Sequence, residues 1–492
     1  MIQRLFKDTL IYGLSAALSR GLAVITLPVY ARILAPADYG AMDILIVAGA
    51  IANLVVPLQV NQALSRYLND VEGAQRRILA STALWFTVGA YIAALGLMLL
   101  GSEWLCQQLL GEIKYLTAFR LSLLSIALTG IFQLLQGQLR FELLSRDHAL
   151  VSILYAVVTV AAGIGLGKFA GLGLVGIIWS QIAAAAIAGV ASMSRLPHRY
   201  GMHFDTGWLR TMLGFSMPLV PAAIATYFTI YSNRFMLNSL ADLESVSIYA
   251  VSARIAGIVN ILIVGFQAAL TPLIYVHYNE PRTPQHLAQI VKVFSTVAFI
   301  CCLGIGLFAP EILMILVPPV YYGASDLVFL VTVSALFSSM SFCFPGIVIA
   351  KKTHYQLIIF SISAVTSIIL NWLLIPYYGV FGAAVATLLS AMLFIGTWIW
   401  TSQRLYPLPL RKRQLIAATL LLILAGLGGV WLHAQFSVGL GLLFFKLTVI
   451  ALFIAALMAM RLFSLSDVSR VLVKIKVKSP GADKVKPNQD SV

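Results

Sequence analysis

Long apolar runs, separated by short polar connections, follow one another along nearly the whole chain. A membrane-crossing α-helix needs roughly 20 mostly apolar residues, and runs of that size predict about fourteen spans. The connections are short, roughly 5 to 20 residues, which leaves no room for a soluble domain. We therefore expect an all-α polytopic membrane protein, with span centres near Gly21, Ala52, Gly89, Leu128, Val158, Ala183, Ala225, Val259, Cys302, Ala335, Ala364, Leu388, Ile423 and Ala451.

The composition excludes a water-soluble globule, because 60% of the residues are hydrophobic and only 10% are charged. The four cysteines have neither the number nor the spacing of a disulfide framework or a zinc site. The seven histidines also lack metal-ligand spacing. We accordingly expect no metal, no cofactor and no catalytic residue.

Lys and Arg gather in alternate connections and at both termini, while acids such as Asp38, Glu112 and Asp242 occupy the other connections. Cytoplasmic loops are enriched in Lys and Arg, so both termini are expected in the cytoplasm, with the chain in the cell's inner membrane. The net charge of +15 then reflects topology. Because the basic residues are scattered over many loops, a nucleic-acid partner is not expected.

Two arginines fall well inside apolar spans. Counting along the first span places Arg20 roughly 15 Å deep, near the midplane of a hydrocarbon core about 30 Å thick. Arg254 lies at a similar depth in the eighth span. A central arginine is costly, so it usually faces a cavity, a partner or a substrate. We expect both residues to line a wet cavity that attracts an anion.

Other charges within the apolar spans leave alternatives open. Arg120 and Arg234 lie near span ends, where a long side chain can reach the interface, and we favour that interpretation over a cavity role. Asp43, one turn inside the second span, is either a helix-start residue or part of an ion pair or proton relay. Lys446 lies well inside the last span, where it indicates either a functional role or a tilted helix.

The chain weakly repeats itself. Helices one and two give Arg20 followed by ARILAPADYGAMDIL, and helices seven and eight give Arg234 followed by FMLNSLADLESVSIYAVSARI. Repeated bundles around a midplane site are a common transporter design, although any two membrane hairpins share some features. We expect two six-helix lobes around a central cavity and two extra helices, with boundaries 1–205, 206–403, 404–462 and a cytoplasmic tail at 463–492.

The PVYARILAPADYG turn, the SNRFML segment followed by SVSIYAVSARI, and the span number together carry a resemblance. From Met1 to Leu462 the chain resembles Wzx-type O-antigen and exopolysaccharide flippases of the multidrug/oligosaccharidyl-lipid/polysaccharide exporter superfamily. The resemblance implies a transporter, without enzymatic activity, that moves an undecaprenyl-pyrophosphate-linked oligosaccharide from the cytoplasmic to the outer leaflet by alternating access. It also implies that Arg20 and Arg254 lie in a cationic cavity.

One residue departs from the family pattern. Many relatives carry an Asp before the arginine late in helix seven, whereas this chain has Asn233 before Arg234. A charged pair between these two neighbours is therefore not expected.

The cargo of such a flippase defines the remaining candidates. Arginine forks would hold the pyrophosphate by charge-assisted hydrogen bonds, and amide side chains would hydrogen-bond the sugars. The expected substrate-binding residues are Arg20, Arg254, Arg234, Asn53, Gln59 and Asn260.

The energy source is expected to be an H⁺ or Na⁺ gradient with Asp43 as the ion-coupling residue. The one glycine-rich candidate for a P-loop, GIGLGKF, has Phe169 where Ser or Thr would bind magnesium. Expected partners are the lipid-linked oligosaccharide, membrane lipids and other polysaccharide assembly proteins.

Two rival classes remain open. An ion-coupled drug exporter of the same superfamily would be expected to place acids rather than arginines in its cavity. A membrane polysaccharide polymerase or ligase would need a sizeable outer loop rich in acids, histidines or arginines, and such a loop is not evident.

Overall fold

The computed structural model describes residues 26–462 apart from 69, 197–199, 278–279, 282, 351, 353, 436–439 and 461. The described residues form α-helices joined by short turns, and no strand occurs among them. The predicted first span with Arg20 and the tail 463–492 lie outside the described residues.

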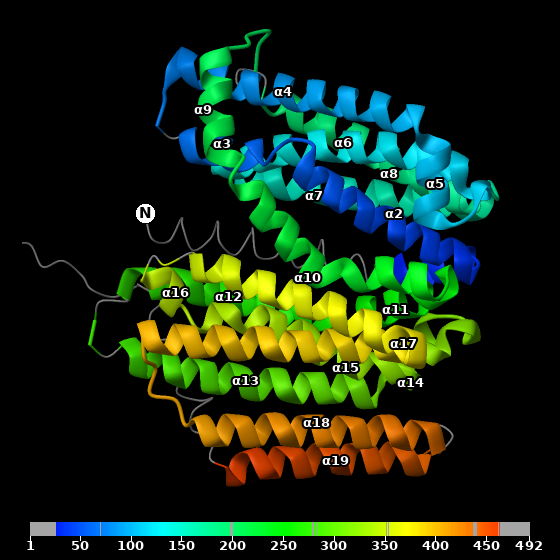
Figure 1. The fold of residues 1–492 in the computed structure, drawn as a ribbon, viewed down its shortest axis with the longest axis vertical. Helices are drawn as coiled ribbons and strands as arrows, with labels where there is room; N and C mark the ends of the chain where they lie inside the picture. Colours follow the sequence, from blue (N-terminus) through cyan, green and yellow to red (C-terminus); the bar gives the residue numbers. More distant parts are fainter. Residues whose placement is uncertain are drawn as a thin grey trace, which may run out of the picture.

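The helices form two bundles, as Figure 1 shows. In the first bundle, α6, α7 and α8 pack against one another, while α2 and α4 pack on α6. In the second, α10 and α15 pack on α17, and α13 packs on α15. The first bundle contains α2 (Pro36–Val55), α3 (Val60–Tyr67), α4 (Gly73–Leu100), α5 (Ser102–Leu110), α6 (Leu116–Phe141), α7 (Ser145–Ile164) and α8 (Gly173–Ser194).

The second bundle follows the amphipathic α9 (Thr206–Ser216), which contacts α3 and α4. It contains α10 (Leu219–Leu240), α11 (Leu243–Ala256), α12 (Ile258–His277), α13 (Thr283–Leu307), α14 (Ala309–Leu316), α15 (Ser325–Ser339), α16 (Gly346–Ile349) and α17 (His354–Leu405). The extra helices α18 (Lys412–Gln435) and α19 (Leu440–Ala459) pack on α13. The lobe boundaries predicted at 205 and 403 stay predictions.

The all-α polytopic fold predicted from the sequence is confirmed. Within the described ranges, ten helices are long and apolar enough to cross a membrane, and two bent helix pairs raise the number to 12. The 52-residue α17 contains a kink at Gly379, where φ is 54°. Few residues other than glycine adopt that conformation readily, so one glycine turns the chain between two crossings. The predicted total of about fourteen spans agrees with this arrangement.

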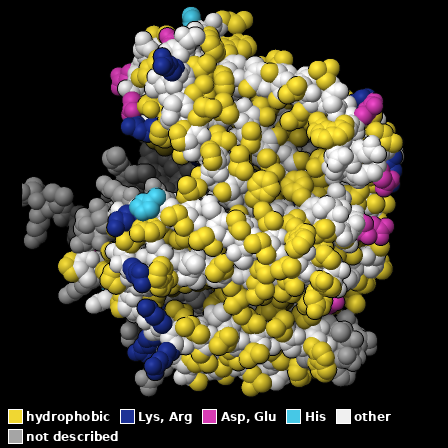
Figure 2. Space-filling view, viewed as in Figure 1, with side chains coloured by type: hydrophobic (Ala, Val, Ile, Leu, Met, Phe, Trp, Pro, Cys, Tyr) yellow, Lys and Arg dark blue, Asp and Glu magenta, His cyan; other side chains and the backbone are white. Residues whose placement is uncertain are grey.

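Charged side chains gather at the two ends of the helices. Figure 2 shows Lys and Arg along the left edge of the second bundle, acidic side chains along the right edge, and an apolar band between them. Exposed tryptophans and aliphatic side chains cover that band, as expected for surfaces that face lipid. We call the two ends the basic end and the acidic end.

Two helix pairs are bent at a short break. The axes of α9 and α10 differ by 45° across residues 217–218, and those of α11 and α12 differ by 42° at Gly257. Pro218 stands at the first break, where a proline cannot donate the hydrogen bond that would continue the helix. The second break ends α11 just after Arg254, inside the membrane.

The chain between α8 and α9 is fastened to the first bundle. Arg77 Nε donates to the Tyr200 carbonyl oxygen at 3.1 Å, and Trp85 Nε1 donates to the Gly201 carbonyl oxygen at 2.9 Å. The Tyr200 hydroxyl bonds to Gln138 Oε1. Burial raises the pKa of the Tyr200 phenol, and the nearby charge of Glu142 adds to the rise, so this hydroxyl stays protonated and can donate.

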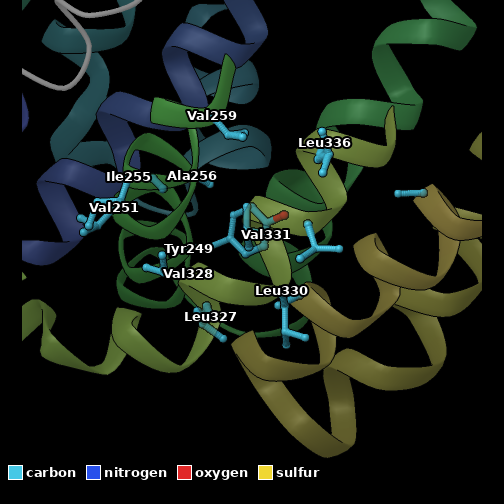
Figure 3. Close-up of a cluster of buried hydrophobic side chains, with 14 of the residues drawn as sticks. Tyr249, Val251, Ile255, Ala256, Val259, Leu327, Val328, Leu330, Val331 and Leu336 are labelled. Carbon is cyan, nitrogen blue, oxygen red and sulfur yellow. The ribbon is translucent and has the colours of Figure 1, made fainter. Parts of the chain in front are cut away.

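The core of the second bundle positions α11. Its residues Tyr249, Val251 and Ile255 belong to one cluster of buried side chains with Leu327 and Val328 of α15, as Figure 3 shows. These side chains are almost fully buried. Because α15 covers one side of α11, another side is left to contact α2 of the first bundle.

Candidate functional site

The two bundles meet where α2 packs against α10 and α11, and we call this contact the seam. A glycine allows the close approach: a Cβ on Gly40 would lie only 1.9 Å from the carbonyl oxygen of Leu243. Hydrogen bonds also cross it. The Tyr227 hydroxyl donates to the Val47 carbonyl oxygen at 2.8 Å.

Three charged side chains meet in the seam. Arg234 Nε on α10 donates to Asp43 Oδ2 on α2 at 2.6 Å. Arg254 Nη2 on α11 lies 3.9 Å from Asp43 Oδ1. Asp43 is only 6% exposed and Arg234 only 9%. One carboxylate therefore faces two guanidinium groups, and we call this set, with a formal charge of +1, the charged cluster.

Tyrosine rings surround both arginines. The Arg254 guanidinium carbon lies 4.7 Å from the centre of the Tyr39 ring. The Arg234 guanidinium carbon lies 5.2 Å from the Tyr231 ring and 5.4 Å from the Tyr249 ring. Aromatic faces attract cations most strongly where water is excluded. The rings thus help to hold two cations that one carboxylate cannot fully neutralise.

Some hydrogen-bonding capacity in and beside the charged cluster is unused. Among the described residues, Arg254 Nη1 and Asn233 Oδ1 are buried without a hydrogen-bond partner. Asn233 Nδ2 donates instead to the Tyr249 hydroxyl and to Thr387 Oγ1. Buried polar groups normally find partners, so an unused guanidinium donor is chemically suited to an anion.

The charged cluster lies in the acidic-end half of the membrane and reaches its middle. At 1.5 Å per residue, Asp43 is about 10 Å beyond the start of α2, and Arg254 is about 16 Å beyond the start of α11. Asp43 is thus about two turns into its helix rather than the one turn expected from the sequence.

The prediction that Arg234 snorkels to the interface is wrong. Its side chain is 11% exposed and carries the 2.6 Å ion pair to Asp43. Arg234 does form a charged pair, although the residue before it is Asn233. The carboxylate comes from Asp43 on α2. Arg120 behaves as expected for a residue at a helix end: its side chain is 47% exposed and lies 3.5 Å from Glu103.

The structure does not bring the predicted glycan-binding amides to the charged cluster. Asn53 lies about 15 Å further along α2 than Asp43 and accepts a 2.6 Å hydrogen bond from the Tyr91 hydroxyl. Gln59 has a left-handed backbone at the break before α3. Asn260 is half-buried in α12, beyond the break at Gly257. Their role stays a prediction, as does that of Arg20.

A second buried ion pair holds the extra helices. Lys446 on α19, which is 1% exposed, lies 2.6 Å from Glu311 Oε1 on α14. This contact gives Lys446 a packing role in joining α19 to the second bundle. The depth of Lys446 in the last span indicated that its charge needs a reason. That depth did not indicate that its partner is Glu311 on α14.

A half-open pocket of about 930 Å³ lies over the seam at the acidic end. Gln108 and Glu112 line it from the first bundle, and Asn238, Ser239 and Asp242 from the second. Asn238 Nδ2 donates to the Leu109 carbonyl oxygen at 2.8 Å within this pocket. Its walls therefore belong to different bundles, and their separation reports whether the seam is closed.

Across the residues that the structure describes, no group of three or more His, Cys, Asp or Glu side chains could hold a metal ion. The arrangement instead suits anion binding in the seam between the two bundles.

Comparison with known proteins places this geometry in context. The family model described as polysaccharide biosynthesis protein matches residues 5–277. No curated protein matches the chain.

Solved structures share the fold. The lipid II flippase MurJ in an inward closed conformation has a TM-score of 0.70 and 14% identity, with 92% of this chain and 99% of that chain covered. An inward-facing multidrug resistance MATE family transporter of the MOP superfamily has a TM-score of 0.65 and 16% identity, covering 82% and 98%. A MOP superfamily transporter from Pyrococcus furiosus, described as having a binding pocket of reverse polarity, has a TM-score of 0.56 and 18% identity, covering 80% and 96%.

Proposed function

The chain belongs to the polysaccharide biosynthesis protein family, and from this premise we propose that it is a flippase for a lipid-linked oligosaccharide. The cargo would be an undecaprenyl-pyrophosphate-linked repeat unit, carried from the cytoplasmic to the outer leaflet for cell-surface polysaccharide biosynthesis. Its class would be that of Wzx-type O-antigen and exopolysaccharide flippases. Both termini would lie in the cytoplasm.

The observation that carries this proposal is the excess of buried positive charge in the seam. Two guanidinium groups share one carboxylate, and Arg254 keeps a buried donor without a partner. A pyrophosphate is very costly to move through hydrocarbon, and arginine forks lower that cost by bidentate, charge-assisted hydrogen bonds. A cation exporter would need the opposite charge balance at this depth.

The arrangement of the bundles supports alternating access. Helix contacts and hydrogen bonds between the first bundle and the second gather around the charged cluster and toward the acidic end. If the basic end is cytoplasmic, as the distribution of Lys and Arg indicates, the closed seam separates the site from the outer face. Rocking of the bundles would open the seam and expose the arginines outward.

The remaining parts of the cargo have proposed contacts too. Arg20 would join Arg254 on the pyrophosphate, and the half-buried Asn53, Gln59 and Asn260 would hydrogen-bond the sugars nearer the basic end. The prenyl tail would stay among membrane lipids. An H⁺ or Na⁺ gradient would supply the energy with Asp43 as the coupling group, and other polysaccharide assembly proteins would receive the cargo.

The experiment that tests this function locates the lipid-linked units in cells that lack the protein. A flippase defect should trap complete single repeat units on the cytoplasmic leaflet, where an impermeant glycan-modifying reagent cannot reach them in intact cells. Re-expression of the wild-type chain should make the units accessible again.

The same assay separates the rival classes. Units exposed on the outer leaflet of the mutant would contradict a flippase and indicate a polymerase or ligase, provided that no second flippase accepts the same sugar. An unchanged lipid-linked pool with greater sensitivity to organic cations would indicate a drug exporter.

A further inference from the structure

We propose that Asp43 competes with the transported anion for the arginines of the second bundle. Asp43 occupies these arginines whenever the seam is closed. The inference rests on the proposed function and adds to it a mechanism of release. Cargo from the cytoplasm would gain the arginines as the seam opens, and Asp43, returning to them as the seam closes, would displace the diphosphate on the outer side.

The geometry divides the charged cluster between the two moving parts. Asp43 belongs to α2 of the first bundle, whereas Arg234 and Arg254 belong to α10 and α11 of the second. The two arginines lie on neighbouring helices of one bundle. These two helices, α10 and α11, pack on each other and on α17. Opening of the seam therefore removes the carboxylate and leaves both guanidinium groups in place.

A carboxylate and a phosphoryl group present similar acceptors to arginine. Asp43 Oδ2 accepts from Arg234 Nε at 2.6 Å, and Asp43 Oδ1 faces Arg254 Nη2 at 3.9 Å. Planar guanidinium forks bind carboxylate and phosphate oxygens in the same way. A diphosphate that bridged both arginines would need the space that Asp43 fills, so the two anions exclude each other.

This exclusion gives the closing movement a chemical consequence. With the seam open, the two arginines need a counter-ion, and the diphosphate supplies it. With the seam closed, the aspartate supplies it and the cargo loses its partners. Because affinity falls in proportion to the fraction of protein in the binding-competent state, occupancy by Asp43 weakens diphosphate binding.

A matched control exists in the same chain. Glu311 and Lys446 form a buried ion pair with the same 2.6 Å separation, but they join α14 to α19, and neither of these helices supplies a residue of the charged cluster. Removing that carboxylate also breaks an ion pair within the membrane, yet it frees no arginine in the seam.

The test measures diphosphate binding to the full-length protein in lipid nanodiscs, with geranylgeranyl diphosphate as the probe. Asp43→Asn keeps the side-chain shape and removes the competing charge, so it should bind the probe about tenfold more tightly than the wild type. Glu311→Gln should bind like the wild type. Arg234→Ala should bind more weakly, because it removes a partner of the diphosphate.

A charge exchange separates competition from a simple clamp. In the double variant Asp43→Arg with Arg234→Asp, an ion pair still crosses the seam, but the second bundle loses a cation. We expect that variant to keep a closed seam and to bind the probe more weakly than the wild type. A clamp that only holds the seam shut, with the diphosphate bound elsewhere, would leave the affinity of the charge-exchange variant equal to that of the wild type.

Three outcomes would overturn the inference. Equal or weaker probe binding by Asp43→Asn, in protein that elutes as a single folded species, excludes competition. Tight binding by the charge-exchange variant excludes the two arginines as the site. Absence of diphosphate binding by every variant overturns both this inference and the proposed function, whereas binding that ignores Asp43 overturns the inference alone.

Discussion

Removal of the Arg234 charge should open the seam toward the acidic end. In Arg234→Met, Asp43 would keep a buried negative charge, with Arg254 3.9 Å away as its nearest described cationic partner. Breaking a buried ion pair by removing one partner costs roughly 3–5 kcal/mol, and the remaining arginine favours the lower end of that range. Since 1.4 kcal/mol is a factor of ten, the closed state should lose about a hundredfold in relative population.

Spin labels across the pocket can measure this shift. Gln108 and Ser239 line opposite walls of the pocket and are exposed. On a background in which the four cysteines are replaced, labels at these two positions should give a short distance in the wild type. Arg234→Met should add a longer one. The apolar pair Asp43→Leu with Arg234→Met should restore the short distance, because replacing a whole buried pair is often neutral.

Two results would refute this reasoning. An unchanged distance distribution in Arg234→Met would mean that the ion pair does not hold the seam. A longer distance in the apolar double variant as well would mean that loss of arginine packing, rather than an unpaired charge, opens it.

Three further predictions concern named residues. Gly40→Val should hold the seam open, because a Cβ at this position would lie 1.9 Å from the backbone of Leu243. A Cβ at Gly89 would meet nothing within 4 Å, so Gly89→Val should change only the local helix. The spin-label distance checks both variants. Lys446→Met should destabilise the protein by about 3–5 kcal/mol, seen as a lower thermal midpoint, and adding Glu311→Leu should recover most of it. Arg120→Ala should leave glycan export nearly normal in a complementation assay, since exposed ion pairs contribute roughly 0–1 kcal/mol.

The number and class of the helices could be predicted because the bilayer imposes a local rule. Each crossing must satisfy its own backbone and present an apolar surface of fixed length, and both requirements are visible in consecutive residues. The breaks in the two bent helix pairs could not be predicted, since length and apolar composition do not show where a helix bends.

The charged cluster could be predicted only in part. Depth counting correctly placed Arg254 deep in its span, but it misjudged Arg234, because depth along a helix does not tell which face meets another helix. Asp43 and Arg234 are 191 positions apart, and nothing local to either indicates the other. The tyrosines at 39 and 249 lie within the two repeated segments, yet their contacts with the arginines depend on how the bundles pack.

Transport by the purified protein tests the central claim most directly. Wild-type protein in liposomes should move a prenyl-diphosphate-linked oligosaccharide between leaflets, scored by its accessibility to an external glycan-modifying enzyme. Arg254→Ala should abolish that movement, Arg254→Lys should retain part of it because the charge remains without the fork, and Arg120→Ala should match the wild type. Equal movement by Arg254→Ala and the wild type would contradict the claim that buried arginines of the seam carry the anionic cargo.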